Sequence, residues 1–264
     1  MARITIGRIA AALLAVACLA ASPAVKPERG VFALQDGKPA IRSMLTVRGS
    51  ASGQNKIDIV QYPIGSTVPI THYTLDQTQL MHLVVVRDDF RSFVHLHPVL
   101  HDNGHFTVDV ALDADHRFYA YADTVPSGDT KQVFRFGLEA GVPPRKLDTT
   151  VAASKPTVHA GPYSVRLQST RIAATQPLRA TVTIQRGGRI ATDLQPYLGA
   201  AAHAVFINTG TLQYVHAHPM YTGAAGTGHM MLMIPALKRG TYKLWLQFRG
   251  DSALYAAPFT IVAR

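Results

Sequence analysis

The chain is poor in cysteine and in charged residues, and it lacks long apolar runs after its first residues. Cys18 is the only cysteine among 264 residues, which excludes an internal disulfide and a metal site made of several thiolates. Charged residues make up 16% and hydrophobic residues 47%, which excludes a disordered polyelectrolyte. No later segment is apolar over the roughly 20 residues that a transmembrane helix needs. The sequence therefore predicts a folded protein that packing alone stabilises.

Motifs of common catalytic centres are also missing from the sequence. It contains no His-Glu-x-x-His, no Gly-x-Ser-x-Gly and no phosphate-binding glycine loop. The net charge is +10, but Lys and Arg are scattered singly along the chain, which argues against a nucleic-acid partner. We therefore expect that the protein is not an enzyme and does not bind nucleic acid.

The first residues are typical of an export signal. Arg3 and Arg8 provide a basic beginning, and Ile9 to Ala21 form an apolar run too short to remain as a membrane span. Small residues allow cleavage after Ala24. We expect residues 1–24 to be a signal peptide and the protein to work in the periplasm or outside the cell.

Cys18 offers a second interpretation of this segment. The sequence Ala15-Val16-Ala17-Cys18 is similar to a bacterial lipobox, although such motifs usually carry Leu where this chain has Ala15. Lipidation of Cys18 would anchor the protein to a membrane, and the sequence leaves this alternative open.

Two stretches about 120 residues apart repeat one pattern of histidines. In each stretch a histidine lies within an apolar run, and a His-x-His-Pro motif begins 13 positions later. The histidines are His82, His95 and His97 in the first stretch, and His203, His216 and His218 in the second. The equal spacing indicates an internal duplication, and therefore two domains.

The spacing of apolar segments and turn residues along the chain predicts an all-β fold with almost no helix. Short apolar segments alternate with Gly, Pro, Asp and Asn at intervals of about ten residues, as in antiparallel sandwiches. We expect two tandem immunoglobulin-like antiparallel β-sandwich domains after the signal segment. The predicted divisions are an irregular segment at 25–55, in which Arg42 to Arg48 can add an edge strand, a first domain at 56–140, a linker at 141–155 and a second domain at 156–264.

Seven strands are expected in each domain. In the first they are 56–62, 68–75, 80–87, 92–97, 105–111, 116–122 and 131–138; in the second they are 163–168, 178–185, 201–208, 213–218, 229–234, 241–248 and 258–263.

Each histidine triplet is a candidate metal site. Side chains two positions apart on a strand point the same way, so the two histidines of each His-x-His motif share a face, and the third can reach them from the neighbouring strand. Three neutral imidazoles suit Zn(II) or Cu(II), whereas calcium and magnesium require oxygen ligands. We therefore predict two separate three-histidine sites, one in each domain.

The strand after each triplet supplies further candidate ligands. His105 lies on the outward face of 105–111, and His229, Met231 and Met233 lie on the outward face of 229–234. Thioethers, including that of Met220, favour Cu(I), so the second domain is expected to prefer copper.

Several alternatives remain at this point. A buried neutral histidine that bonds a backbone carbonyl is common, so the triplets can be purely structural. The sandwiches would then bind a protein partner. A zinc ion on three histidines can instead activate water, which would make the protein a hydrolase.

The histidine blocks also resemble a known group of proteins. The blocks are similar to those of bacterial secreted two-domain proteins, a largely uncharacterised family usually described as secreted or heavy-metal-associated. They are Leu80 to Arg87 with Phe93 to Pro98, and Asp193 to Ala200 with His203 and Tyr214 to Pro219. The resemblance implies an exported tandem β-sandwich protein with a loose association with metal handling, and it supplies no activity. From the ligand types we expect the ion to be copper or zinc, and a periplasmic or cell-surface protein can be its partner. In that family pattern a further histidine occupies the position of Gln77, and His72 is the residue that would replace it.

Overall fold

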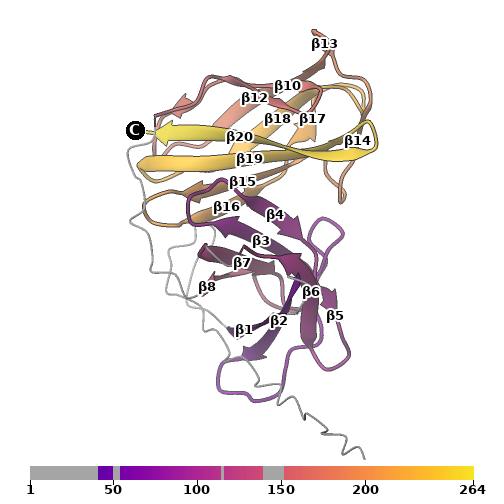
Figure 1. Cartoon of the computed structure of the whole chain (residues 1–264), viewed down its shortest axis with the longest axis vertical. Coiled ribbons are helices and arrows are strands. Elements are labelled where there is room, and N and C mark those ends of the chain that lie inside the picture. The colour runs from indigo at the N-terminus through magenta and orange to yellow at the C-terminus, as the bar shows by residue number, and fades with distance from the viewer. Residues whose placement is uncertain (1–40, 50–53, 114–115, 139–151) are drawn as a thin grey trace, which may run out of the picture.

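The computed structural model describes residues 41–49, 54–113, 116–138 and 152–264, and within these residues every regular element is a β-strand. Figure 1 shows two stacked units, each made of two sheets, with the N-terminal unit coloured indigo to magenta and the C-terminal unit salmon to yellow. Within the described residues no helix is long and apolar enough to cross a membrane. The all-β prediction is confirmed.

The first unit pairs two four-stranded antiparallel sheets. The outer sheet has the order β1-β2-β6-β5 and the inner sheet the order β4-β3-β7-β8. The strands are β1 (Ile41–Gly49), β2 (Gln54–Pro63), β3 (Met81–Arg87), β4 (Phe93–Leu96), β5 (Val99–Leu100), β6 (His105–Ala111), β7 (Phe118–Thr124) and β8 (Gln132–Leu138).

The second unit repeats this arrangement with more strands. Its outer sheet has the order β17-β18-β12-β10-β9, with β13 paired to β12, and its inner sheet the order β11-β20-β19-β15-β16, with β14 paired to β19. The strands are β9 (Thr157–Ala160), β10 (Tyr163–Leu167), β11 (Arg171–Ile172), β12 (Leu178–Arg186), β13 (Arg189–Ile190), β14 (Leu194–Gln195), β15 (His203–Asn208), β16 (Tyr214–Ala217), β17 (Met220–Tyr221), β18 (His229–Ile234), β19 (Gly240–Gly250) and β20 (Ala253–Ala263).

The two units share the strand order of an immunoglobulin-like sandwich. In chain order, β1, β2, β3, β4, β5, β6, β7 and β8 correspond to β10, β12, β15, β16, β17, β18, β19 and β20. The first, second, fifth and sixth of these strands form one sheet and the remaining four form the other, as in immunoglobulin domains with one additional strand. The duplication read from the sequence is therefore also a duplication of fold.

The central strands of the inner sheets are buried on both faces, because the sheets pack against their own outer sheet on one side and against each other on the other. Strand β3 shows this alternation: Leu83 and Val85 join the core of the first sandwich, whereas Val84 and Val86 join a separate apolar cluster. That cluster contains residues from both units and forms the interface between them. Strands β3 and β4 lie beside β15 and β16 at this interface (Figure 1).

Aromatic side chains hold the two inner sheets together. Phe93 of the first unit stacks on Trp245 of the second, with ring centres 4.9 Å apart. Tyr214 of the second unit stacks on Tyr121 of the first at the same separation. These two pairs occupy corresponding positions in the duplicated strands, so the interface has approximate twofold symmetry.

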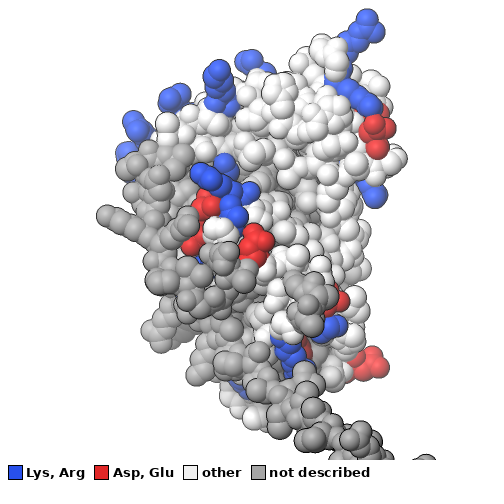
Figure 2. Space-filling model, in the orientation of Figure 1, with Lys and Arg blue, Asp and Glu red and all other residues white. Residues whose placement is uncertain are grey.

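Most basic side chains lie on the surface, although Arg135 is buried. On the face shown in Figure 2, Lys and Arg are dispersed along the outer edge of the second unit, and others lie next to Asp and Glu lower on the same face. This distribution agrees with the scattered positive charge of the sequence.

One strand prediction is wrong. Residues 68–75 were expected to form a strand, but they run as an irregular segment with an isolated bridge at Tyr73. Pro69 has no N–H to donate, and the next residue, Ile70, donates to the carbonyl of Gln61 instead of extending a ladder. Strands that are only two residues long, such as β5 and β17, were not predicted.

The segment 25–55, expected to be irregular, contributes a full edge strand. β1 pairs with β2 along its whole length, from Ile41 opposite Pro63 to Gly49 opposite Asn55, in agreement with the edge strand suggested for Arg42 to Arg48. The predicted signal peptide at 1–24 lies outside the described residues, as does most of the predicted linker at 141–155.

Candidate metal centre

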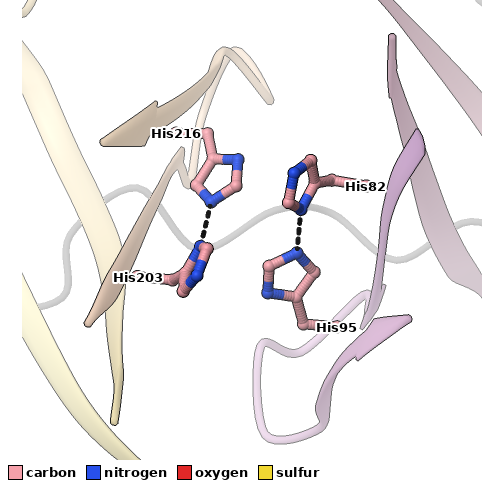
Figure 3. Close-up of side chains that lie close together, drawn as sticks. All are labelled: His82, His95, His203 and His216. Carbon is pink, nitrogen blue, oxygen red and sulfur yellow. Dashed lines mark hydrogen bonds between the residues drawn. The ribbon is translucent and has the colours of Figure 1, made fainter. Parts of the chain in front are cut away.

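Four buried histidines meet where the two inner sheets face each other. They are His82 of β3 and His95 of β4 in the first unit, and His203 of β15 and His216 of β16 in the second. One ring nitrogen from each histidine lies within 4.8 Å of the other three, which is a group that can hold a metal ion. Figure 3 shows the two pairs, one from each unit, with their rings pointing toward a common centre.

Strand alternation aims these side chains at the interface. His82 shares a face of β3 with Val84 and Val86, and both valines belong to the cluster between the units. His203 shares a face of β15 with Val205 and Ile207 of the same cluster. The duplicated register therefore directs both histidines away from their own sandwich cores and toward each other.

Two backbone carbonyls hold the outer nitrogens of the histidines on the central strands. The Nε2–H of His82 donates to the carbonyl of Asp76 at 2.9 Å, and the Nε2–H of His203 donates to the carbonyl of Tyr197 at 3.0 Å. A carbonyl oxygen can only accept, so in both rings the proton is on Nε2 and the lone pair is on the inward-facing Nδ1.

Each carbonyl begins a tight turn with unusual backbone angles. The central residues have positive φ in both turns: 46° at Gln77 and 69° at Thr78, and 50° at Leu198 and 77° at Gly199. Such angles are costly for residues other than glycine, above all for a β-branched threonine. A Cβ on Gly199 would lie 3.2 Å from Cγ2 of Thr78, so the two turns pack against each other beside the histidines.

The histidines on the flanking strands are oriented across the interface. His95 Nδ1 lies 2.9 Å from Oε1 of Gln247 in the second unit. His216 Nδ1 lies 3.5 Å from Oδ2 of Asp123 in the first unit. Asp123 and Gln247 are equivalent positions, because they pair across the sheet with His82 and His203 respectively. Each unit therefore places an oxygen beside the other unit's histidine: Gln247 is at hydrogen-bond distance from His95, whereas His216 Nδ1 faces Asp123 without a hydrogen-bond partner in the described residues.

The inward-facing nitrogens are close together. His82 Nδ1 and His95 Nε2 are 3.0 Å apart, and His203 Nδ1 and His216 Nε2 are 3.1 Å apart (Figure 3). With protons on all the outer nitrogens, four lone pairs point into the same small volume. Histidine metal ligands are typically held in this way, with the second ring nitrogen donating to a carbonyl or a carboxylate.

In the second unit, no placement of protons on two neutral imidazoles satisfies all the polar contacts of His203 and His216. If the inner Nε2 of His216 carried the proton, its Nδ1 lone pair would face the Asp123 carboxylate; if the inner Nδ1 of His203 carried it, the Nε2 lone pair would face the Tyr197 carbonyl. A cation between the rings removes the conflict. Burial and the neighbouring His218 lower the pKa of His216 well below its ordinary value, so a proton is a poor candidate for that cation at neutral pH.

Burial keeps the rings of His203 and His95 neutral as well. It is the first cause that lowers the pKa of His203 to about 3 and that lowers the pKa of His95 well below its ordinary value. Neighbouring imidazoles act in the same direction, because each would repel a second positive charge. Neutral imidazole is the form that binds metal ions.

Two carboxylates and one ammonium group lie beside the cluster. Lys131 Nζ binds Asp76 at 2.6 Å and Asp123 at 3.2 Å. Burial opposes a charged lysine, but the carboxylates of Asp123 and Asp76 outweigh it and raise the pKa of Lys131. One negative charge among these three groups remains uncompensated, and it lies where it favours a cation held by the histidines.

Two further histidines flank the buried four. His97 and His218 follow β4 and β16, and each is half-buried beside the pair of its own unit. Burial lowers the pKa of both to about 4. Their Nε2 atoms are buried and have no hydrogen-bond partner within the described part of the chain.

Residues 157–264 match a family model described as a domain of unknown function (DUF8832). That description is of an uncharacterised family, as the sequence resemblance implied, and it names no metal. No curated protein matches the chain. Among solved structures, the chain is similar to native E. coli alpha-2-macroglobulin, with 12% sequence identity and a TM-score of 0.23. The alignment covers 84% of this chain and 16% of the macroglobulin chain, so this chain spans a small part of that protein's length.

The expectation that the three histidines of each triplet come together is confirmed, but the expectation that the two groups are separate, one in each domain, is wrong. The two triplets do not lie apart in their own sandwiches, because the inner sheets pack face to face and bring all the triplet histidines into one cluster. The ring centres of His82 and His216, from different units, are only 5.0 Å apart. The interpretation of His82 and His203 as buried rings bonded to backbone carbonyls is correct for their outer nitrogens.

The other predicted ligands lie in the outer sheets, away from the cluster. His105 on β6 bonds Asp58 at 2.7 Å, and His229, Met231 and Met233 lie on β18. Met233 faces outward as predicted, with 41% of its surface exposed, but outward on β18 is the side remote from the interface. The thioethers therefore give no reason to prefer copper at the histidine cluster.

The two residues that the sequence resemblance singled out, His72 and Gln77, also lie outside the histidine cluster. His72 is exposed, and its Nδ1 lies 2.9 Å from the hydroxyl of Thr71. Gln77 occupies one of the tight turns beside the cluster and provides no ring nitrogen.

The sequence reasoning missed Asp123 and Gln247. Each is a buried polar residue inside an apolar strand, and each lies opposite a triplet histidine. A polar residue within such a strand is the signal that would have found them.

Proposed function

We propose that the protein is an exported transition-metal-binding protein that holds copper or zinc between its two units through His82, His95, His203 and His216. The observation that carries this proposal is the convergence of four inward ring nitrogens; an oxygen is hydrogen-bonded to the opposite nitrogen in three of the rings, and in the fourth, His216, that nitrogen faces the Asp123 carboxylate at 3.5 Å. An all-imidazole ligand set suits Zn(II) and copper and does not suit calcium or magnesium.

The spacing of the rings supports one ion among the four. A ring that binds an ion at about 2.0–2.1 Å has its centre about 3.2 Å from the ion, so tetrahedral ligands have ring centres about 5.2 Å apart. The six separations among the four rings run from 5.0 to 5.8 Å. Small rotations of the side chains would bring the nitrogens onto a common ion.

We infer a role in binding or transfer, without catalysis. Catalytic zinc sites keep one position open for water or substrate, whereas four protein ligands close the site. The zinc-hydrolase alternative has no such open position in this arrangement. Export rests on the basic and apolar character of residues 1–24, and the partner that delivers or receives the ion is a periplasmic or cell-surface protein.

A structural role is the competing interpretation, because the paired rings lie at hydrogen-bond distance and the interface is well packed. Metal-dependent stability separates the two. Ions that bind only the folded protein raise the free energy of unfolding by about 2.7 kcal/mol at a hundredfold excess over the dissociation constant. For a chain of this size that is roughly 5–11 °C in melting temperature.

The experiment compares melting curves of untagged protein with and without Zn(II) or Cu(II). The wild type and a His105→Ala control, which alters a histidine on an outer sheet, should both gain stability. A His95→Ala variant should gain little or none. If saturating metal leaves the wild-type curve unchanged, or if protein isolated from the periplasm contains no copper or zinc, the histidines are structural and the proposal is wrong.

A further inference from the structure

His97 and His218 lie outside the four histidines whose ring nitrogens converge, and each lies beside the pair of its own unit. Each Nε2 is buried and has no partner in the described part of the chain, although a buried polar atom normally has one. The duplication gives both the same position, two residues after a histidine that belongs to the four.

The rings of each triplet have the spacing of three ligands on one ion. His97 has its ring centre 4.7 Å from that of His95 and 5.1 Å from that of His82, and His82 and His95 are 5.2 Å apart. Three imidazoles around one ion are expected to have ring centres between about 4.5 and 5.2 Å apart, from octahedral to tetrahedral angles.

The second triplet repeats this triangle. His218 has its ring centre 4.5 Å from that of His216 and 4.9 Å from that of His203, and His203 and His216 are 5.3 Å apart. Both triangles have nearly equal sides, which is what two equivalent ions would require.

We propose that the cluster takes two metal ions side by side, one on His82, His95 and His97 and the other on the second triplet. This rests on the proposed function, because the four inward lone pairs that fit one ion are divided between two when the flanking rings join. Paired ions in proteins usually lie about 3.5–4 Å apart. Asp76 and Asp123 lie beside the cluster and offset part of the added positive charge.

Metal stoichiometry tests the proposal. Untagged full-length protein is titrated with Zn(II) against a chromophoric chelator strong enough to remove weakly held surface ions. We expect two ions for each chain. A His97→Ala, His218→Ala variant should hold one ion on the remaining four histidines, and a matched control that replaces two exposed histidines, His101→Ala with His229→Ala, should still hold two.

Loading with Cu(II) adds a readout that a remote second site would not produce. Two adjacent Cu(II) ions couple magnetically, so the paramagnetic resonance of the wild type should account for much less copper than is bound. In the His97→Ala, His218→Ala variant the signal should account for all the bound copper.

The outcomes distinguish the two proposals. One ion in the wild type, unchanged in the His97→Ala, His218→Ala variant, overturns the paired centre and leaves the single-ion function standing. No retained ion in the wild type overturns both. Two ions with an uncoupled signal also overturn the paired centre, because the second ion would then lie elsewhere. Melting curves of the metal-free variants show whether each one is folded.

Discussion

Gln247 provides the sharpest test of whether the histidine cluster is built for a metal. It is 6% exposed, and its Oε1 lies 2.9 Å from Nδ1 of His95, whose other nitrogen faces the proposed ion. A Gln247→Leu substitution keeps a side chain of similar length and removes the acceptor. We expect it to weaken metal binding more than it weakens the metal-free fold.

The size of the effect follows from where the imidazole proton can go. With metal bound, His95 must keep its proton on Nδ1, where the leucine variant leaves it buried without an acceptor, at a cost of about 1–3 kcal/mol. Without metal, the proton can move to Nε2, where His82 Nδ1 accepts it at 3.0 Å, and the Nδ1 lone pair is then left without a donor. The N–H of a metal-bound ring carries part of the charge of the ion, so the loss of its acceptor costs more than an unpaired lone pair on a neutral ring. The metal-bound state therefore loses more free energy, and the dissociation constant should rise by up to about 150-fold.

The assay is a competition titration against a chelator of known affinity, together with urea denaturation of the metal-free protein. Gln61→Leu is the matched control: Gln61 is a fully buried glutamine that accepts a hydrogen bond from Thr124 and touches no histidine of the cluster. Gln247→Glu should restore binding, because it keeps the acceptor and imitates Asp123 of the other unit. If Gln247→Leu binds metal as tightly as the wild type, or if Gln61→Leu weakens binding equally, the orientation argument is wrong.

Three further results are expected. Because burial lowers the pKa of His203 from 6.5 to about 3, the unfolded chain takes up its proton first on acidification, so stability is lost as pH falls from about 6.5 toward 3. Denaturation of metal-free protein should show a loss of about 2 kcal/mol or more between pH 7.5 and pH 5; equal stability at both would contradict a neutral buried ring. Met231→Leu with Met233→Leu should leave Cu(I) affinity in a chelator titration unchanged, since both residues lie on an outer sheet; weaker binding would place thioethers in the site. Trp245→Ala removes the stack on Phe93 and should cost about 3–5 kcal/mol in urea denaturation, with a parallel loss of metal affinity. Unchanged affinity in this variant would show that the site does not need the interface.

The sequence by itself determined the fold class and the duplication. Spacing of apolar segments and turn residues reflects the two-residue period of strands, so the positions of β3, β6, β15 and β18 followed to within about two residues. The strand predicted at residues 68–75 was wrong because apolar side chains also occur in an irregular segment that packs on a sheet.

The six histidines were also recognisable in the sequence, because their spacing repeats and because side chains two positions apart share a strand face. The sequence did not show whether the histidines lie on the strand face that meets their own sandwich core or on the opposite face. Strands β3 and β15 are apolar on both sides, and a run such as Leu83 to Val86 does not say which side meets its own core and which side meets another unit.

Only the tertiary structure decided that the two triplets form one centre. Contacts between His82 and His216, or between His95 and Gln247, join residues more than 100 positions apart, and they depend on how two complete sandwiches dock. Docking is set by apolar surface spread over both inner sheets, which no local motif encodes. The same docking brings the side-chain oxygens of Asp123 and Gln247 to the opposite unit's histidines, so the chemistry of the site is a property of the interface between the two units.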